Sequence, residues 1–162
     1  MKIVLVGTAY PMRGGIAQFI ALLYKCFSVR NDVKMFSFKR QYPEFLFPGK
    51  TQYEQGEPTL KIPDDKNNIS VDSINPFNWI NIGLQIAKEK PGLIIFKYWL
   101  PYFAPCYTVI SFIAKLFSNT KVLFICDNVI PHEKRFGDKF FTKLAFTQVD
   151  YCLLYTSDAA DE

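Results

Sequence analysis

Histidine is almost absent from this chain of 162 residues, since His132 is the single one. The four cysteines form no C-x-x-C pair; they are Cys26, Cys106, Cys126 and Cys152. A zinc site needs such pairs or several histidines at fixed spacing, so the sequence predicts no metal site. We expect the cysteines to be small buried side chains in a protein of the reducing cytosol.

The chain also lacks internal repeats, and the apolar run after Met1 is too short for a signal peptide. Hydrophobic residues make up 49% of a chain of one-domain length, which is enough for a core and argues against disorder. The net charge of +4 is modest. A solvated basic face explains it, and affinity for a nucleotide, a phosphate or an anionic membrane is the alternative.

The first twenty residues predict a buried strand that leads through a loop into a helix. The strand covers the apolar run 2–7 and the loop covers 8–13. Gly14 and Gly15 then open a helix, and their spacing matches neither the dinucleotide nor the P-loop fingerprint. Free N–H groups at a helix start favour an anion. A tight turn without a ligand is the other interpretation. The apolar residues at helical spacing are Ile16, Phe19, Ile20, Leu23 and Phe27.

Further strands are expected wherever short apolar runs recur, at 33–38, 69–71, 93–96, 121–126 and 149–154. Asn75 followed by Pro76 predicts a helix start, and the helix should end near Lys90. Its apolar stripe consists of Phe77, Ile80, Leu84 and Ala87. The proline-rich stretch 39–68 lacks periodicity, and we expect an ordered excursion over the sheet edge.

Two segments raise the question of a membrane. Residues 98–114 carry no charge, but Pro101 and Pro105 interrupt them, so a buried helix is favoured over membrane contact. The basic, aromatic segment 134–148 predicts an amphipathic surface helix, and a helix lying on an anionic membrane is the alternative.

Polar and aromatic side chains follow two of the buried strands. Lys97, Tyr98 and Trp99 come at the end of one, and 127–133 (DNVIPHE) follows another. Ligands of open α/β sheets bind at the carboxyl ends of strands, so both segments are candidate binding sites. His132 lies beside Glu133, and a neighbouring carboxylate favours the charged form of a histidine.

The final eleven residues, CLLYTSDAADE, resemble a translated sequencing adapter. We therefore expect one domain over residues 1–151 and a non-native tail over 152–162, so that the natural protein would be longer.

The motifs GTAYPMRGGIAQF (7–19) and NVIPHE (128–133) resemble the N-terminal half of a GT-B glycosyltransferase of glycosyltransferase family 4. The resemblance implies a Rossmann-like α/β fold with an open, mostly parallel sheet and helices on both faces. It implies the acceptor-binding domain of a retaining enzyme that transfers a sugar from a nucleotide-sugar to a glycan or lipid-linked acceptor. The nucleotide-sugar is a co-substrate, and no cofactor or metal is implied. The fragment alone should be inactive because the donor half is absent.

The resemblance also implies roles for individual residues. Arg13, Gly14 and Gly15 would bind the donor diphosphate. The predicted catalytic residues are Asp127 and His132, and the predicted acceptor-binding residues are Tyr98, Trp99, Asn128 and Glu133. Asp127 departs from the family, in which many members carry a histidine at this position. The implied location is cytoplasmic, peripheral on the inner face of the membrane.

Two other functions remain open from the residues alone. One is a small flavodoxin-like domain that binds a nucleotide or cofactor, because it needs the same strand, loop and helix. The other is a non-enzymatic protein of the membrane surface. No nucleic-acid partner is expected.

Overall fold

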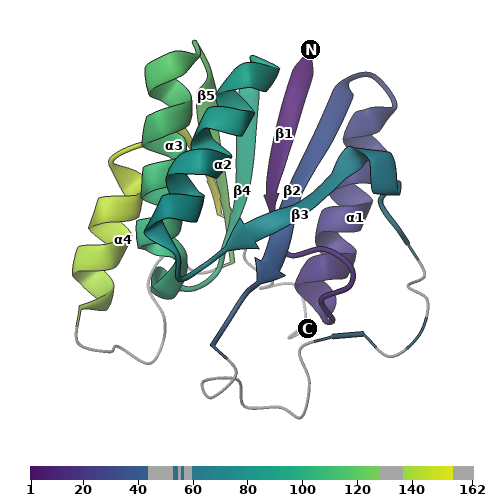
Figure 1. Cartoon of the computed structure of the whole chain (residues 1–162), viewed down its shortest axis with the longest axis horizontal. Helices are drawn as coiled ribbons and strands as arrows, with labels where there is room; N and C mark the ends of the chain where they lie inside the picture. Colours follow the sequence, from purple (N-terminus) through teal and green to yellow (C-terminus); the bar gives the residue numbers. More distant parts are fainter. Residues whose placement is uncertain (44–52, 55, 57–59, 128–136, 155–162) are drawn as a thin grey trace, which may run out of the picture.

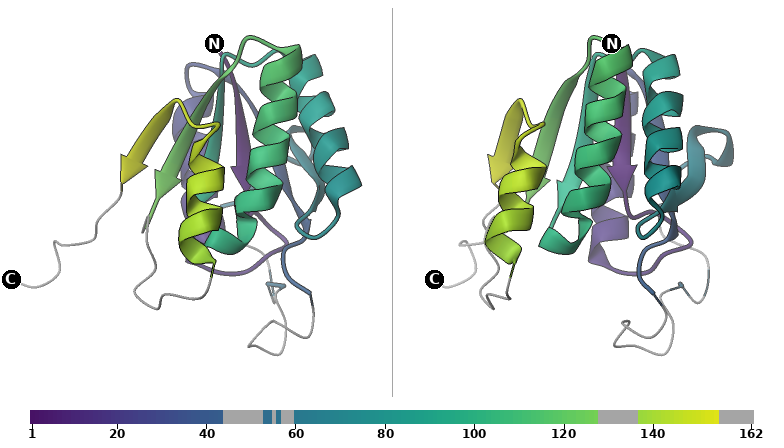
Figure 2. Two further views of the ribbon diagram at one scale, coloured as in Figure 1. Left: turned by 90° about the vertical axis from the view of Figure 1, so that its left-hand side faces the viewer. Right: turned by 60° about the vertical axis from the view of Figure 1, so that its left-hand side comes forward.

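The computed structural model is an α/β sandwich in which one parallel sheet lies between helices on both faces (Figures 1 and 2). The structure describes residues 1–43, 53–54, 56, 60–127 and 137–154. Its strands are β1 (Lys2–Gly7), β2 (Asp32–Arg40), β3 (Asn67–Asp72), β4 (Leu93–Tyr98), β5 (Lys121–Cys126) and β6 (Tyr151–Leu154). Its helices are α1 (Gly15–Ser28), α2 (Pro76–Glu89), α3 (Ala104–Phe117), α4 (Asp138–Phe146) and the short η2 (Asp64–Lys66) and η3 (Pro101–Phe103).

The sheet has the order β3-β2-β1-β4-β5-β6, and every neighbouring pair of strands is parallel. The chain places β2 and β3 on one side of β1, and it then places β4, β5 and β6 on the other side. The strand order therefore reverses between β1 and β4. Beyond the carboxyl ends of these two strands the connections diverge, and this is where open α/β sheets bind ligands. The predicted Rossmann-like fold is confirmed.

The two faces of the sheet build two cores because successive side chains of a strand point to opposite sides. Val4 and Val6 of β1 belong to the core that α2, α3 and α4 cover. Ile3 and Leu5 belong to the core that α1 covers. Figure 2 shows the resulting layers, with α2, α3 and α4 on one side of the sheet and α1 on the other.

The ends of α2 confirm the sequence-based assignment. The Asn75 side chain accepts hydrogen bonds from the backbone N–H groups of Phe77 (3.1 Å) and Asn78 (3.3 Å), and Pro76 occupies the first helical position. These bonds satisfy two of the donors that a helix start leaves unpaired. Lys90 ends the helix in the left-handed conformation, with φ 49°.

The predicted apolar stripe on α2 is wrong for three of its four residues, and Ala87 alone of the four is buried as predicted. Phe77 is 84% exposed, and Ile80 and Leu84 are exposed as well. The side of α2 that faces the core carries Ile82, Gly83, Ile86 and Ala87. Gly83 allows α2 to pack closely on α3, so helix-to-helix contact decides which side of α2 is buried.

The cysteines also differ from expectation in part. Cys106 and Cys126 are buried, but Cys26 and Cys152 are exposed. Cys26 lies in the last turns of α1, and Cys152 lies in β6, the edge strand of the sheet. Their positions on the outside of an element override the general preference of cysteine for the interior.

The proline-rich stretch is more regular than predicted at both of its ends. β2 continues to Arg40, and β3 begins at Asn67 and pairs with β2. The middle of the stretch, residues 44–52, lies outside the described residues. At the other edge of the sheet, the predicted domain boundary after Tyr151 falls inside β6.

The two segments considered for a membrane are helical. The uncharged segment forms η3 and most of α3, and α3 is buried along one side, as predicted. α4 (Asp138–Phe146) forms the middle of the basic, aromatic segment, and residues 134–136 lie outside the described residues. In the part of the chain that the structure describes, no helix has the length and apolar character that a membrane span requires.

Candidate functional site

The connection from β1 to α1 exposes its backbone at the carboxyl edge of the sheet. Gly14 caps α1 with φ 115° and ψ 170°, a conformation that residues other than glycine rarely adopt. Arg13, Gly14 and Gly15 are exposed. A Cβ atom placed on either glycine would meet no described atom within 4 Å. The first turn of α1 is therefore open to a ligand from outside.

Two backbone hydrogen bonds hold this connection in place. The backbone N–H of Met12 donates to the carbonyl of Ala9 (2.9 Å), and the N–H of Glu54 donates to the carbonyl of Pro11 (2.9 Å). Met12 also forms an isolated antiparallel bridge with Tyr53. Because Met12 is buried in the core, the loop before the two glycines has a defined position.

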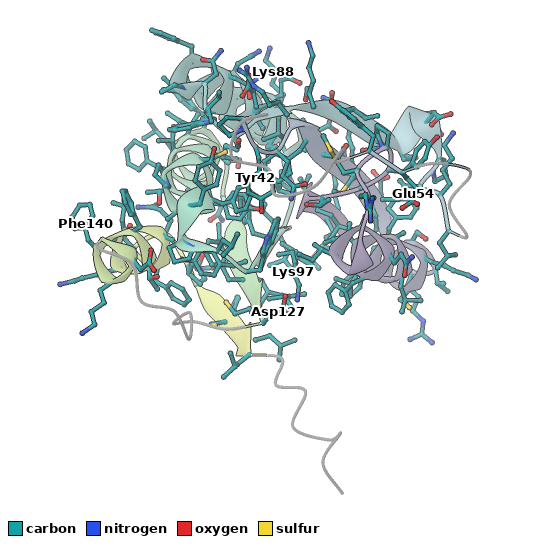
Figure 3. The ribbon with its side chains drawn as sticks, turned by 90° about the horizontal axis from the view of Figure 1, so that it is seen from below. Tyr42, Glu54, Lys88, Lys97, Asp127 and Phe140 are labelled. Atoms are coloured by element: carbon teal, nitrogen blue, oxygen red, sulfur yellow. The ribbon has the colours of Figure 1, made fainter. Side chains whose placement is uncertain are left out.

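A buried ion pair lies at the same edge of the sheet. Lys97 of β4 has a side chain that is 3% exposed, and its Nζ forms an ion pair with Oδ1 of Asp127, the residue after β5. The ammonium also lies 4.4 Å from the centre of the Phe19 ring of α1. Figure 3 shows Lys97 and Asp127 together at the carboxyl end of the sheet.

This ion pair lies at the reversal of strand order. The Cβ of Lys97 is 3.7 Å from the position that a Cβ on Gly7, the last residue of β1, would occupy. The lysine stem therefore packs beside Gly7 of β1, next to Ile20 of α1. A charged ammonium in the protein interior needs groups that stabilise its charge. Here the Asp127 carboxylate and the Phe19 ring both lie against the Lys97 ammonium. Asp127, whose side chain is 38% exposed, connects the pair to the solvent.

The sequence placed Lys97 at a candidate binding edge, but no role was predicted for it, although a signal for one was present. The run LIIFKY forms β4, and Lys97 is its only charged residue. In a strand of period two, Lys97 shares a face with Leu93 and Ile95 and should be buried. A charge on the buried face, at the carboxyl end of a strand, marks a functional candidate in its own right.

Tyr98 lies in the core and not at the surface, where acceptor binding would require it. Its ring is fully buried and stacks on Phe124 at 5.4 Å between centres. Its hydroxyl group lies 3.2 Å from Oγ1 of Thr142 in α4. Burial raises the pKa of the Tyr98 hydroxyl above its ordinary value. The strand turns this ring away from the edge, toward α4, because Tyr98 and Lys97 point to opposite faces.

Trp99 belongs to a group of aromatic side chains on the same side of the sheet as Tyr98. It is partly buried and packs on Phe103 at 4.6 Å. Tyr42, which follows β2, lies 5.5 Å from Phe103 and 5.7 Å from Tyr102, measured between ring centres. Burial raises the pKa of the Tyr42 hydroxyl. Tyr102 remains partly exposed, so this aromatic group reaches the surface.

The structure brings some of the predicted site residues to one edge and leaves others undescribed. Arg13, Gly14 and Gly15 lie at the start of α1, and Asp127 and Trp99 lie at the ends of β5 and β4. Asn128, His132 and Glu133 lie outside the described residues, so their predicted roles stay predictions. Within the described ranges, no group of three or more His, Cys, Asp or Glu side chains could hold a metal.

Comparisons by sequence find no relatives. No family model matches the chain, and no curated protein matches it.

Comparison of structures does find a similar fold. The UDP-GlcNAc 2-epimerase from Methanocaldococcus jannaschii matches 98% of this chain with a TM-score of 0.54 and 11% sequence identity. The chain spans 40% of the length of that epimerase chain. A protein of unknown function from Vibrio parahaemolyticus matches 97% of this chain and 93% of its own, at 12% identity, but its TM-score of 0.42 is too low to carry an argument. The first likeness identifies the fold as a Rossmann-like domain of the GT-B-like kind.

Proposed function

We propose that the chain is the acceptor-binding domain of a retaining glycosyltransferase that uses a nucleotide-sugar. The acceptor is a glycan or a lipid-linked sugar, and a separate domain binds most of the donor. The open first turn of α1 is the observation that carries the proposal. Its N–H groups and the positive end of the helix dipole would stabilise the negative charge that develops on the departing nucleotide diphosphate. Arg13 would add a cation next to them.

Two further observations support the proposal. The turn lies at the reversal of strand order, where α/β sheets bind nucleotides. The structurally similar epimerase carries UDP-GlcNAc, a nucleotide-sugar, in its name. The roles of Asp127 and His132 near the reacting sugar, and of Trp99, Asn128 and Glu133 toward the acceptor, belong to the same proposal. Because the donor domain is separate, we expect this chain alone not to transfer sugar.

Contact with a membrane surface is part of the proposal, because lipid-linked acceptors are embedded in one. On α4, Phe140 is 65% exposed, Phe141 is also exposed, and Lys139 and Lys143 lie beside them on the surface. Exposed aromatic rings next to lysines suit the interface of an anionic bilayer. Flotation with anionic vesicles at low and high salt tests this contact. Absence of flotation under both conditions would contradict it.

The test of the proposed function assays this chain together with the proposed donor domain for sugar transfer from a panel of nucleotide-sugars. Gly15→Trp places a bulky side chain over the open turn, and we expect transfer to fall by about a hundredfold or more while the fold is kept. Leu22→Trp is the matched control, because Leu22 lies on the exposed side of α1. Unchanged transfer in Gly15→Trp would contradict the role of the turn. Micromolar binding of flavin mononucleotide to this chain would instead favour the flavodoxin-like alternative.

A further inference from the structure

Lys97 is held on two sides and does not reach the solvent. Its Nζ forms the ion pair with Asp127 and lies over the Phe19 ring, and its side chain is 3% exposed. A ligand at the edge of the sheet would therefore meet Asp127 first. Lys97 can therefore act on such a ligand through the aspartate.

Asp127 is fixed by its backbone as well as by its side chain. Its N–H donates to the carbonyl of Tyr98 (3.3 Å), which ties the start of the loop after β5 to the end of β4. Its Oδ1 accepts from Lys97, while 38% of the side chain remains exposed. The carboxylate is thus anchored on the inside and presents a hydrogen-bond acceptor to the outside.

The chemistry of this pair selects the part of the ligand that lies against it. An exposed carboxylate accepts a hydrogen bond from a hydroxyl group, but it repels a phosphate or another carboxylate. The exposed backbone N–H groups at the start of α1 have the opposite preference. The anionic diphosphate of the donor would therefore lie at α1, and the hydroxyl groups of the acceptor would lie at the end of β5.

We propose that Lys97 is a positioning residue that orients the Asp127 carboxylate to accept a hydrogen bond from a hydroxyl group of a neutral sugar. The inference rests on the proposed function and narrows it, because it assigns the acceptor hydroxyl groups to the end of β5. The Phe19 ring supports the orientation by holding the ammonium from the side of α1.

The test measures binding of methyl glycosides of glucose, galactose, mannose and N-acetylglucosamine to this chain by saturation-transfer NMR. At least one glycoside should bind the natural sequence. Asp127→Asn should weaken that binding by about tenfold, as expected when a hydrogen bond loses its charged acceptor. Lys97→Met should weaken it to a similar extent, and the double variant should bind no worse than either single variant. Lys88→Met, at an exposed position on α2, is the matched control and should bind normally.

A purely structural role for Lys97 would give a different result. Lys97→Met would then lower the unfolding temperature and leave the affinity of the folded protein unchanged, and this outcome would overturn the proposal. Lys97→Arg keeps the cation and should restore part of the affinity, which provides a second comparison if the methionine variant does not fold. Absence of glycoside binding to the natural sequence would also overturn the inference. The transfer assay with Gly15→Trp is independent of all these measurements, so failure of the inference and failure of the proposed function can be distinguished.

Discussion

The Lys97 ammonium lies 4.4 Å from the centre of the Phe19 ring, which joins the end of β4 to α1 at the point where the strand order reverses. Lys97 and Phe19 are far apart in the sequence. The contact forms because β4 pairs with β1, and this pairing places Lys97 next to α1. The contact gives a physical basis for the candidate site.

Gly14 and Gly15 should respond in opposite ways to substitution by alanine. Gly14→Ala forces a side chain into a backbone conformation with φ 115°, so the free energy of unfolding should fall by about 1–3 kcal/mol. Gly15→Ala has open space around it and starts a helix, so the free energy of unfolding should stay equal or rise by up to about 1 kcal/mol. Urea unfolding followed by circular dichroism measures both. Equal destabilisation of the two variants would show that the conformation at Gly14 is not specific to glycine.

Gly83 should not tolerate alanine, although alanine favours helices. A Cβ at this position would lie 2.7 Å from the Cβ of Ile113 and 3.0 Å from the carbonyl oxygen of Ile110. Because α2 and α3 must separate to make room, we expect the free energy of unfolding to fall by about 1–3 kcal/mol. Leu84→Ala, at the next and more exposed position, is the control and should change it by about 0.5 kcal/mol or less. A stabilised Gly83→Ala variant would contradict the close packing of the two helices.

Glu89 should make stability depend on pH in the acidic range. Hydrogen bonds from Lys34 (2.5 Å) and Lys2 (3.1 Å) lower the pKa of Glu89 below its ordinary value. A carboxyl whose pKa is lower in the folded state contributes stability above its unfolded pKa, and this contribution is lost as the pH falls through the folded pKa. Urea unfolding at pH 7 and pH 3 should therefore show a larger loss for the natural sequence than for Glu89→Gln. Asp150 also has a lowered pKa, so part of the loss should remain in that variant. An identical loss in both proteins would contradict the role of Glu89.

The cysteines should divide into two classes of reactivity. Burial raises the pKa of the Cys126 thiol to about 12 and raises that of Cys106 as well, so neither forms the reactive thiolate at neutral pH. Cys26 is exposed and should react with iodoacetamide in the folded protein. Mass spectrometry after a short pulse of reagent, with and without urea, identifies the modified positions. Rapid labelling of Cys106 without urea would show that the core opens locally.

Local sequence signals predicted most elements of the fold. Runs of β-branched residues marked the buried strands. Asn75 with Pro76 marked the start of α2, because the side chain of Asn75 accepts hydrogen bonds from backbone N–H groups only two and three residues further on. Three of the four residues in the predicted stripe on α2 were wrong because burial there does not depend on local sequence. Which side of α2 is buried depends on its contact with α3, and a helix with apolar residues on more than one side does not reveal that contact in its own sequence.

The candidate site could be predicted only in part. The exposed glycine turn follows from a short segment, and its position was correct. Lys97 was expected at the carboxyl end of its strand, but its role was not predicted because its partners come from α1 and from the end of β5. Tyr98 was expected at an acceptor, but the alternation of the strand turns its ring into the core, where α4 covers it.

The sequence by itself determined the succession of strands and helices, the cap of α2 and the glycine turn, because each depends on neighbouring residues or on a repeat within one element. The alternation of strands and helices in turn predicted a mostly parallel sheet. Only the tertiary structure decided the order of the strands and the partners of the buried lysine. These depend on which strands become neighbours, and that choice is made by the packing of distant apolar faces, which no single segment encodes.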